Sequence, residues 1–371
     1  MTQTPMTLDP RFASAGPRTV QSEDISASRG LARWLASNRL SFACTSYQTG
    51  RLMLVGSHED GAVAVNQCGF DRAMGLCWRP GRLYVAAKSA VWRLENILRP
   101  GERANGVHDV VLTPRNAQLT GDLDVHEIGV DAQGRSTFVN TSFSCLATTD
   151  PVHSFRPLWK PPFITRLAPE DRCHLNGVAF GIDGAPAYVS AAGVSDIVGG
   201  WREHRGDGGV LIDVRTDMIV AEGLSMPHSP RVVGDEIFFL DSGRGWIVRL
   251  DPISGERRDV AFCPGFLRGL AIHNGHALVT VSQPREAGFK GLPLEANLEA
   301  RGAVAWCGVL VVQLSTGDIV EWMRFNGAVT EVFDVVALPG IRCPMVIAPD
   351  SAEAQQTITF IDGVDDVSAV R

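Results

Sequence analysis

Residues 227–262 read PHSPRVVGDEIFFLDSGRGWIVRLDPISGERRDVAF, and this stretch decides the fold. It holds four apolar runs of strand length, separated by turns rich in Gly, Asp and Ser. This pattern predicts four consecutive strands, each antiparallel to the one before it. A single sheet of this kind cannot bury both of its faces, so we expect it to pack against further copies of itself.

Similar units recur along the chain at a spacing of roughly 40–55 residues, a range typical of propeller blades. They lie at 41–65, 74–95, 124–144, 174–220, 267–325 and 333–350. Such repeats predict an all-β fold, a β-propeller, in which sheets stacked around an axis protect each other's faces and edges. Counting every unit slightly favours seven blades, whereas six result if the first and last units join to close the ring. A pair of β-sandwiches is the alternative fold.

The N-terminal segment differs from the repeats. Its first residues, up to about residue 25, are polar and contain proline, which predicts a flexible arm. In SRGLARWLASN (28–38), Leu31, Trp34 and Leu35 fall on one side of a helix. We therefore predict an arm with a short helix over residues 1–38 and a single propeller domain over residues 39–371.

The composition excludes several classes of function. The chain of 371 residues is 45% hydrophobic and 20% charged, with a net charge of −7 and a pI near 5.7. An acidic chain without a basic cluster is not expected to bind nucleic acid, and no apolar run is long enough to cross a membrane. The N-terminus lacks the apolar core of a secretory signal, and the eight cysteines are scattered without a CxxC pair. We therefore expect a cytoplasmic protein with reduced thiols.

Three histidines occupy similar places in three successive units: GDLDVHEIGV (121–130), DRCHLNGVAF (171–180) and GLSMPHSPRV (223–232). In a propeller the first strand of each blade lines the central channel. We therefore expect His126, His174 and His228 to converge at one mouth of this channel. The alignment puts His126 at the position of Asn176, and His228 nearer that of Leu175. The same reasoning predicts further polar residues at the mouth: Asn176, Arg268 and Asp334, with Glu127 and Arg231 beside them.

The histidines predict a metal site. Neutral imidazole is the commonest ligand of transition metals in proteins, and three histidines leave a position open for water or substrate. The ion would be a divalent transition metal, Zn, Fe or Cu, and Glu127 as an added ligand would favour iron. Asp122 and Asp124 are candidates to orient the rings, and His108 is the candidate fourth ligand. In the alternative interpretation, each histidine only caps a strand or hydrogen-bonds to a neighbouring blade.

Three charged residues near the mouth are candidates for catalysis: Glu127, Arg231 and Arg268. A guanidinium at this place could hold a carboxylate or phosphate group of a substrate. In the alternative interpretation, the two arginines form salt bridges with Asp241, Asp334 or an acidic residue of another blade.

Several motifs carry family resemblances. HLNGVAF (174–180) resembles the first strand of the gluconolactonase and senescence-marker-type six-bladed propellers, which implies a channel metal bound by Asn176, although that family's acidic ligands have no match here. FLDSGRGWIVRLD (239–251) resembles NHL-type propellers, which include a peptide-amidating lyase whose channel zinc is held by histidines. Together with GDLDVHEIG and MPHSPR, these motifs resemble an uncharacterised bacterial family of conserved hypothetical β-propeller proteins.

Two functions follow from these expectations. The first is a metal-dependent enzyme, a lyase, hydrolase or oxidoreductase, that acts on a small molecule or a peptide at the histidine-lined channel. The second is a non-catalytic scaffold that binds a protein or a glycan on its rim through an aromatic patch, for which Trp159, Trp201 and Trp322 are candidates.

Overall fold

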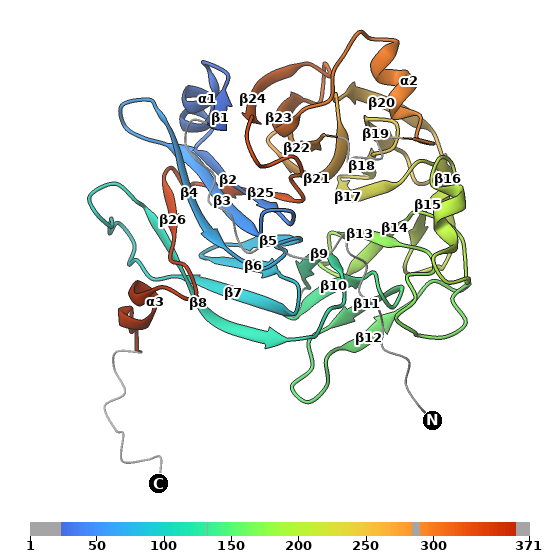
Figure 1. Ribbon diagram of the computed structural model, residues 1–371, viewed down its shortest axis with the longest axis horizontal. Coiled ribbons are helices and arrows are strands. Elements are labelled where there is room, and N and C mark those ends of the chain that lie inside the picture. The colour runs from blue at the N-terminus through green and yellow to red at the C-terminus, as the bar shows by residue number, and fades with distance from the viewer. Residues whose placement is uncertain (1–23, 132, 284–289, 361–371) are drawn as a thin grey trace.

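The computed structural model describes residues 24–131, 133–283 and 290–360. In this part of the chain the strands form six sheets of four or five strands, arranged as blades around one axis (Figure 1). The innermost strands touch one another in a closed ring, in the order β25, β5, β9, β13, β17 and β21. The predicted β-propeller is confirmed, and its blades number six, the smaller of the two counts considered.

Blades 1 to 3 contain most of the N-terminal half of the chain. Blade 1 consists of β25 (Val335–Pro339), β2 (Leu40–Ser46), β3 (Arg51–Ser57) and β4 (Val63–Gly69). Blade 2 consists of β5 (Leu76–Arg79), β6 (Arg82–Ala86), β7 (Ala90–Asn96), β8 (Val110–Leu119) and, at its outer edge, β26 (Pro344–Val346). Blade 3 consists of β9 (Val125–Val130), β10 (Ser136–Asn140), β11 (Cys145–Thr148) and β12 (Arg156–Trp159).

Blades 4 to 6 follow in chain order. Blade 4 consists of β13 (Leu175–Phe180), β14 (Pro186–Ala191), β15 (Gly209–Asp213) and β16 (Ile219–Leu224). Blade 5 consists of β17 (Pro227–Val233), β18 (Glu236–Asp241), β19 (Trp246–Leu250) and β20 (Arg257–Phe262), so the stretch 227–262 forms the four strands that its sequence predicts. Blade 6 consists of β21 (Phe266–His273), β22 (His276–Ser282), β23 (Cys307–Gln313), β24 (Ile319–Phe325) and, at its outer edge, β1 (Ile25–Ala27).

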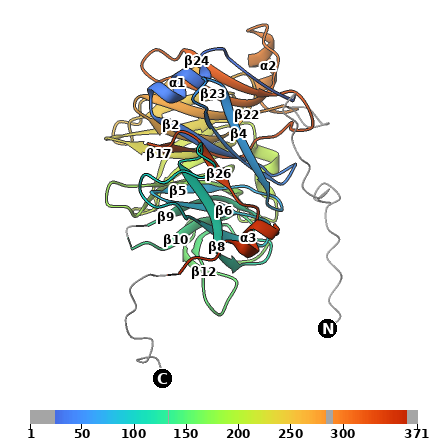
Figure 2. The same ribbon diagram turned by 90° about the vertical axis from the view of Figure 1, so that its left-hand side faces the viewer.

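Blade 1 closes the ring because it combines the two ends of the chain. Its inner strand β25 runs antiparallel to β2, with Val335 opposite Cys44 and Pro339 opposite Leu40. The chain then crosses to blade 2, where β26 pairs in parallel with β8 and also contacts β4 (Figure 2). On the other side of blade 1, β1 pairs with β24. Both terminal strands therefore cover outer sheet edges that would otherwise present unpaired backbone groups.

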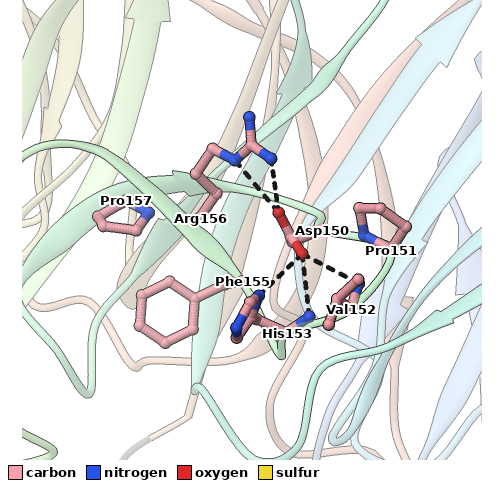
Figure 3. Close-up of a pocket in the computed structure, with 7 residues that line it drawn as sticks. All are labelled: Asp150, Pro151, Val152, His153, Phe155, Arg156 and Pro157. Carbon is pink, nitrogen blue, oxygen red and sulfur yellow. Dashed lines mark hydrogen bonds and ion pairs between the residues drawn. The ribbon is translucent and has the colours of Figure 1, made fainter.

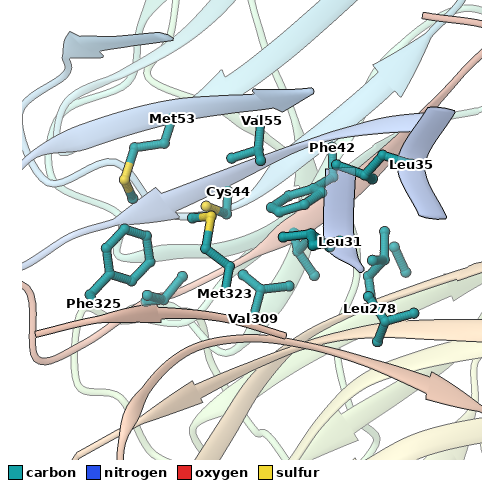
Figure 4. Packing of buried hydrophobic residues seen from close by; sticks show 14 of the residues in the cluster. Leu31, Leu35, Phe42, Cys44, Met53, Val55, Leu278, Val309, Met323 and Phe325 are labelled. Carbon is teal, nitrogen blue, oxygen red and sulfur yellow. The ribbon is translucent and has the colours of Figure 1, made fainter. Parts of the chain in front are cut away.

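The helix predicted over 28–38 is present as α1 (Leu31–Ser37), and it packs between blades 1 and 6. Leu31 and Leu35 are fully buried there (Figure 4). Trp34 packs against the same cluster. Their neighbours come from both blades: Phe42, Cys44, Met53, Val55, Val309, Met323 and Phe325. Burying one leucine of this kind contributes about 1.5–3 kcal/mol relative to leaving it in water.

Two connections longer than a hairpin meet on one face of the ring. The β14–β15 connection contains a 3-10 helix (Gly200–His204), and the β22–β23 connection contains α2 (Leu294–Glu299). Their apolar side chains share one buried cluster: Ala192, Trp201, Met226, Phe266, Leu294 and Leu298. The Arg205 side chain also donates to the carbonyl of Lys290. A third short helix, α3 (Ala352–Gln356), follows β26.

All eight cysteines lie within the described ranges and are free thiols. Burial raises the pKa of all eight, for example that of Cys44 to about 12. No helix in the described part of the chain combines the length and the apolar character needed to cross a membrane.

Candidate functional site

The inner strands carry the predicted site residues to the channel. β9 bears His126 and Glu127, β13 bears Asn176, β17 bears His228 and Arg231, and β21 bears Arg268. His174 immediately precedes β13, and Asp334 immediately precedes β25. We call His126, His174, Asn176, His228, Arg268 and Phe333 the channel mouth, and Glu127, Arg231 and Asp334 the channel interior.

Strand register shows that His126, Asn176 and His228 hold one equivalent position on three successive blades. Each follows a residue paired with the end of the next strand: Val125 with Asn140, Leu175 with Ala191, and Pro227 with Asp241. The alignment that put His228 nearer Leu175 was therefore wrong by one residue, because β9, β13 and β17 each carry a bulge just beyond this position. His174 is the different one, since it lies two residues before Asn176.

His126 and His228 are anchored in the same way through Nδ1. Nδ1 of His126 lies 3.0 Å from the carbonyl oxygen of Asp124 and 2.8 Å from Oγ1 of Thr141. Nδ1 of His228 lies 2.8 Å from the carbonyl oxygen of Met226 and 3.0 Å from Oγ of Ser242. A carbonyl oxygen only accepts hydrogen bonds, so both Nδ1 atoms carry the hydrogen and a neutral ring then has its lone pair on Nε2.

Burial keeps these two rings neutral. Loss of hydration lowers the pKa of His126 to about 4, and it lowers the pKa of His228 well below its ordinary value. The positive charge of Arg268 acts in the same direction on both rings. At neutral pH each ring therefore offers an unprotonated Nε2, the form that binds a metal ion or accepts a hydrogen bond.

His174 is oriented by a carboxylate. Its Nδ1 lies 2.9 and 3.1 Å from the two carboxylate oxygens of Asp171, which also accepts a hydrogen bond of 2.9 Å from the indole nitrogen of Trp201. The imidazole stacks on the Trp201 ring at 4.1 Å between centroids and meets the His126 ring edge-on at 4.9 Å. The predicted convergence of His126 and His174 is thus observed, and His228 is near enough for its pKa to respond to both.

Two acceptor atoms at the mouth are buried and have no hydrogen-bond partner among the residues that the structure describes: Oδ1 of Asn176 and Nε2 of His228. The Asn176 side chain is 2% exposed and that of His228 only 3%. Nδ2 of Asn176 donates to the carbonyl oxygen of Pro227 at 3.1 Å, which fixes Oδ1 as the atom that is left over. An unsatisfied buried polar atom costs about 1–3 kcal/mol, so each such atom in a folded protein calls for an explanation.

Arg268 lies across the mouth within an aromatic setting. Its guanidinium carbon is 5.0 Å from the ring centre of Phe266 and 5.3 Å from those of Phe333 and Tyr47. It pairs with the Glu331 carboxylate at 3.5 Å, and burial raises the pKa of Glu331 to about 7. Phe333 also contacts the His126 ring, at 5.3 Å between centroids. The guanidinium of Arg268 therefore lies among three aromatic rings.

The channel interior holds a fully bonded charge cluster. Glu127 pairs with Arg231 at 2.5 Å, and its second oxygen accepts a hydrogen bond of 2.8 Å from the backbone nitrogen of Val178. The two oxygens of Asp334 accept from the backbone nitrogens of Leu76, at 2.7 Å, and Val335, at 2.8 Å. Burial raises the pKa values of both carboxyls, and the charge of Glu127 adds to the shift of Asp334, whose pKa reaches about 7.

Gly177 explains the Asn-Gly pair of HLNGVAF. A Cβ atom added there would lie 2.7 Å from Oε2 of Glu127 and 2.6 Å from Cδ of Pro230. Only glycine therefore lets the Glu127 carboxylate of blade 3 reach the backbone of blade 4.

Among the remaining predicted residues, Asp122 and Asp124 pair with Arg72. Asp124 also lies beside the mouth, because its carbonyl oxygen orients His126 and its carboxylate is 3.7 Å from Nδ1 of the same ring. The others lie elsewhere. Asp241 pairs with Arg244 at 3.2 Å and not with Arg231 or Arg268. His108 lies before β8, where its Nδ1 is 3.5 Å from Sγ of Cys343, so Asn176 and not His108 joins the mouth.

Within the described residues, no three His, Cys, Asp or Glu side chains are arranged to hold a metal ion as they stand. A ligand set at the mouth must therefore include the Asn176 amide, or the rings must move together. The neutral Nε2 atoms and the unpaired amide oxygen are suitable donors for Zn, Fe or Cu. The positive charge of Arg268 acts against a cation, and the carboxyl groups of Glu331 and Asp124 oppose that effect.

Two open cavities lie away from the mouth. One of about 410 Å³ is formed by the 150–157 turn, where Oδ1 of Asp150 accepts from the backbone nitrogens of Val152 and His153, and Oδ2 accepts from Arg156 (Figure 3). The other, of about 370 Å³, lies between blades 2 and 3 and shares Pro151 and Arg156 with the first. Neither is lined by a mouth residue, and the polar groups of the turn already bond to one another.

Sequence reasoning placed no aromatic residue at the mouth, and it named Trp201 only as a candidate for a patch on the rim. Phe333 and Tyr47 come from the closure of blade 1, and Trp201 comes from the β14–β15 connection. These segments do not resemble the repeated unit, so no alignment of blades points to them. The one available signal was the length of the connection that carries Trp201.

Comparisons with known proteins identify the family and give one structural likeness. Residues 29–347 match a family described as Domain of unknown function (DUF4915), and the chain belongs to this family. Among solved structures, the "Crystal structure of Nidogen/Laminin Complex" contains a similar chain, with a TM-score of 0.52 and 11% identity over 82% of this chain and 99% of that one. At such low identity the likeness extends to the propeller fold alone. No curated protein sequence matches.

Proposed function

We propose that this member of the DUF4915 family is an enzyme that binds a divalent transition metal at the channel mouth and acts there on a small molecule or a peptide. One observation carries the proposal. Asn176 and His228 each bury an acceptor atom without a partner, at equivalent positions on neighbouring blades. A bound cation would satisfy both atoms and so explain why the folded protein buries them without a partner.

The anchoring of the three histidines supports the same proposal. Histidines that bind a metal through Nε2 commonly donate their Nδ1 hydrogen to a carbonyl or a carboxylate, which fixes the ring and makes it more basic. His126 and His228 have such a partner in a backbone carbonyl, and His174 has one in Asp171. The proposed donors are therefore His126, Asn176 and His228, with His174 beside them. Asn176 is also the residue that the gluconolactonase resemblance assigns to a metal.

A metal ion at this place would supply Lewis-acid or redox chemistry. The chain's own residues would prepare the surroundings. Trp201 and Phe266 limit access of water to His174 and His228, since each ring packs against one of them. Arg268, held by Glu331, would attract a negative group of the substrate toward the aromatic side of the mouth.

Metal analysis of the untagged protein tests the proposal. We expect the wild type to contain zinc, iron or copper, and we expect His228→Ala and Asn176→Ala each to lose about one equivalent of it. His153→Ala, which removes an exposed histidine of the 150–157 turn, should keep the wild-type content. Equal metal content in the wild type and in the two mouth variants, after incubation with each metal salt and dialysis, would contradict the proposal.

One observation favours the second function, a binding scaffold. Val194, Ile197 and Val198 are 50%, 73% and 66% exposed on the connection that carries Trp201. Trp201, one of the three tryptophans predicted for such a patch, is buried against His174, so an apolar patch on this connection would consist of the aliphatic residues. Pull-down of a partner that depends on Val194 and Ile197, but not on His228, would support the scaffold over the enzyme.

A further inference from the structure

The chain crosses from blade 1 to blade 2 between β25 and β26, and Cys343 lies in this crossing. Its side chain is only 2% exposed. The carboxylate of Asp109 holds the crossing in place, because its two oxygens accept from the backbone nitrogens of Arg342, at 2.8 Å, and Cys343, at 2.9 Å. The thiol is therefore presented in a fixed position at the closure of the ring.

Two histidines flank this thiol from opposite sides of the crossing. His58 follows β3 of blade 1, and its Nδ1 lies 4.0 Å from Sγ of Cys343. His108 precedes β8 of blade 2, and its Nδ1 lies 3.5 Å from the same sulfur. Both imidazoles are half-buried. Two imidazole nitrogens and one sulfur thus meet where three separate segments of the chain come together.

We propose that His58, His108 and Cys343 form a second metal site, for a soft ion such as Zn²⁺ or Cu⁺, that fastens the closure of the propeller. Sulfur and imidazole nitrogen are the donors these ions prefer. Bond lengths of about 2.3 Å to sulfur and 2.0–2.1 Å to nitrogen place the two donors roughly 3.6 Å apart around a tetrahedral ion. The contact between Cys343 and His108 already has this separation.

One adjustment is needed for the site to form. The contact with His58 is a few tenths of an ångström too long, in keeping with the finding that no three such side chains are yet arranged around an ion in the described residues. His58 lies in the turn after β3, where a small rotation of its half-buried ring brings Nδ1 closer. Nδ1 of His108 must also exchange its contact with the Cys343 carbonyl, at 3.2 Å, for the ion.

The position gives the ion a structural role. His58 belongs to blade 1, His108 to blade 2, and Cys343 to the segment that leaves the closing strand. An ion bound to all three would link the N-terminal and C-terminal parts of the closed ring. Because it binds the folded ring and not the unfolded chain, it raises the melting temperature.

Cobalt titration of the full-length protein tests the site. A thiolate bound to Co²⁺ gives a charge-transfer band in the near ultraviolet, and the mouth residues include no cysteine, so an ion bound at the mouth gives no such band. We expect the band in the wild type, in Cys77→Ser and in the mouth variant His228→Ala. We expect at least a tenfold loss of the band in Cys343→Ser, and a clear loss in His58→Ala and His108→Ala.

In the mouth variant His228→Ala, zinc should raise the melting temperature by several degrees, and it should leave that of the double variant His228→Ala/Cys343→Ser unchanged. If Cys343→Ser does not fold, His58→Ala serves instead, because its side chain is partly exposed. A wild type without the band at saturating cobalt, or a band that survives in folded Cys343→Ser, would overturn the proposal. A mouth that binds no metal would leave it intact, since the two sites share no residue.

Discussion

The channel interior and the channel mouth differ in whether their buried polar groups have hydrogen-bond partners. In the interior, each carboxylate oxygen of Glu127 and Asp334 has a partner in Arg231 or in a backbone nitrogen. At the mouth, on the inner strands β13 and β17, Asn176 and His228 leave acceptor atoms without a partner among the described residues. The interior is satisfied by the protein alone, whereas the mouth is not.

This difference distinguishes buried polar groups that stabilise the fold from buried polar groups that are available to a ligand. The bonds of Glu127 and Asp334 reach from blade 3 to blade 4 and from blade 1 to blade 2, so the interior links neighbouring blades across the axis. A buried network of this kind stabilises the fold only while every member is present. The mouth has the opposite character, because its unpaired acceptors cost stability until a ligand binds them. Glu127 and Arg231, first considered as catalytic candidates, therefore fit a structural role better than Arg268 does.

Removing the interior cation should produce the largest effect. Arg231→Met leaves two buried carboxyl groups without their positive charge, which for fully buried pairs costs about 3–5 kcal/mol. Since the Arg231 side chain is 24% exposed, we expect a loss of about 2–4 kcal/mol in the free energy of unfolding, measured with urea. Arg249→Met, which breaks the exposed pair with Glu236, should cost less than about 1 kcal/mol. Similar small losses in both variants would show that the interior does not hold the blades together.

The interior should also make stability depend on pH in an unusual direction. The pKa of Asp334 is about 7 in the folded protein, against an ordinary value of 3.8, so the folded state retains a proton that the unfolded state has lost. This contribution to stability is fully present below about pH 4 and is lost as the pH rises toward 7, at up to about 1.4 kcal/mol per pH unit. Asp334→Asn should flatten the decline between pH 5 and 7.

Urea unfolding at several pH values measures this slope. Asp259→Asn, which alters an exposed carboxylate paired with Arg244, is the matched control and should follow the wild type. A wild-type stability that is level or rising between pH 5 and 7 would mean that Asp334 is ionised throughout and that Arg231 compensates both carboxylates.

The fold was largely predictable from the sequence, and the blade count was not. The turns and apolar runs of 227–262 mark a complete blade because its four strands are consecutive. Blade 1 is divided between β25 and β2–β4, so its two parts look like separate units in the sequence. Only pairing between Val335 and Cys44, which are far apart in the chain, shows that they are one.

The site was predictable only where it followed the repeat. His126, His174 and His228 could be found because they precede similar strands, but the bulges in β9, β13 and β17 hid which of them are equivalent. Trp201 lies in an inserted connection, and the contact of Cys343 with His108 arises only after the ring closes. The spacing of residues along the chain does not predict such contacts.

The smallest expected effect is the one that bears most directly on the mouth. His228→Leu removes the bond from Nδ1 to the Met226 carbonyl, a loss of about 0.5–1.5 kcal/mol, but it also removes a buried acceptor that costs about 1–3 kcal/mol. We therefore expect the free energy of unfolding of His228→Leu, measured with urea, to lie within about 1 kcal/mol of that of the metal-free wild type. Thr45→Val is the contrasting variant, since Thr45 donates to the Met74 carbonyl at 2.6 Å and accepts from the Asp334 nitrogen at 3.1 Å. Its loss leaves both backbone groups unpaired and should cost more than His228→Leu. If His228→Leu is the more damaging of the two, the imidazole stabilises the propeller itself, and the contrast between mouth and interior no longer holds.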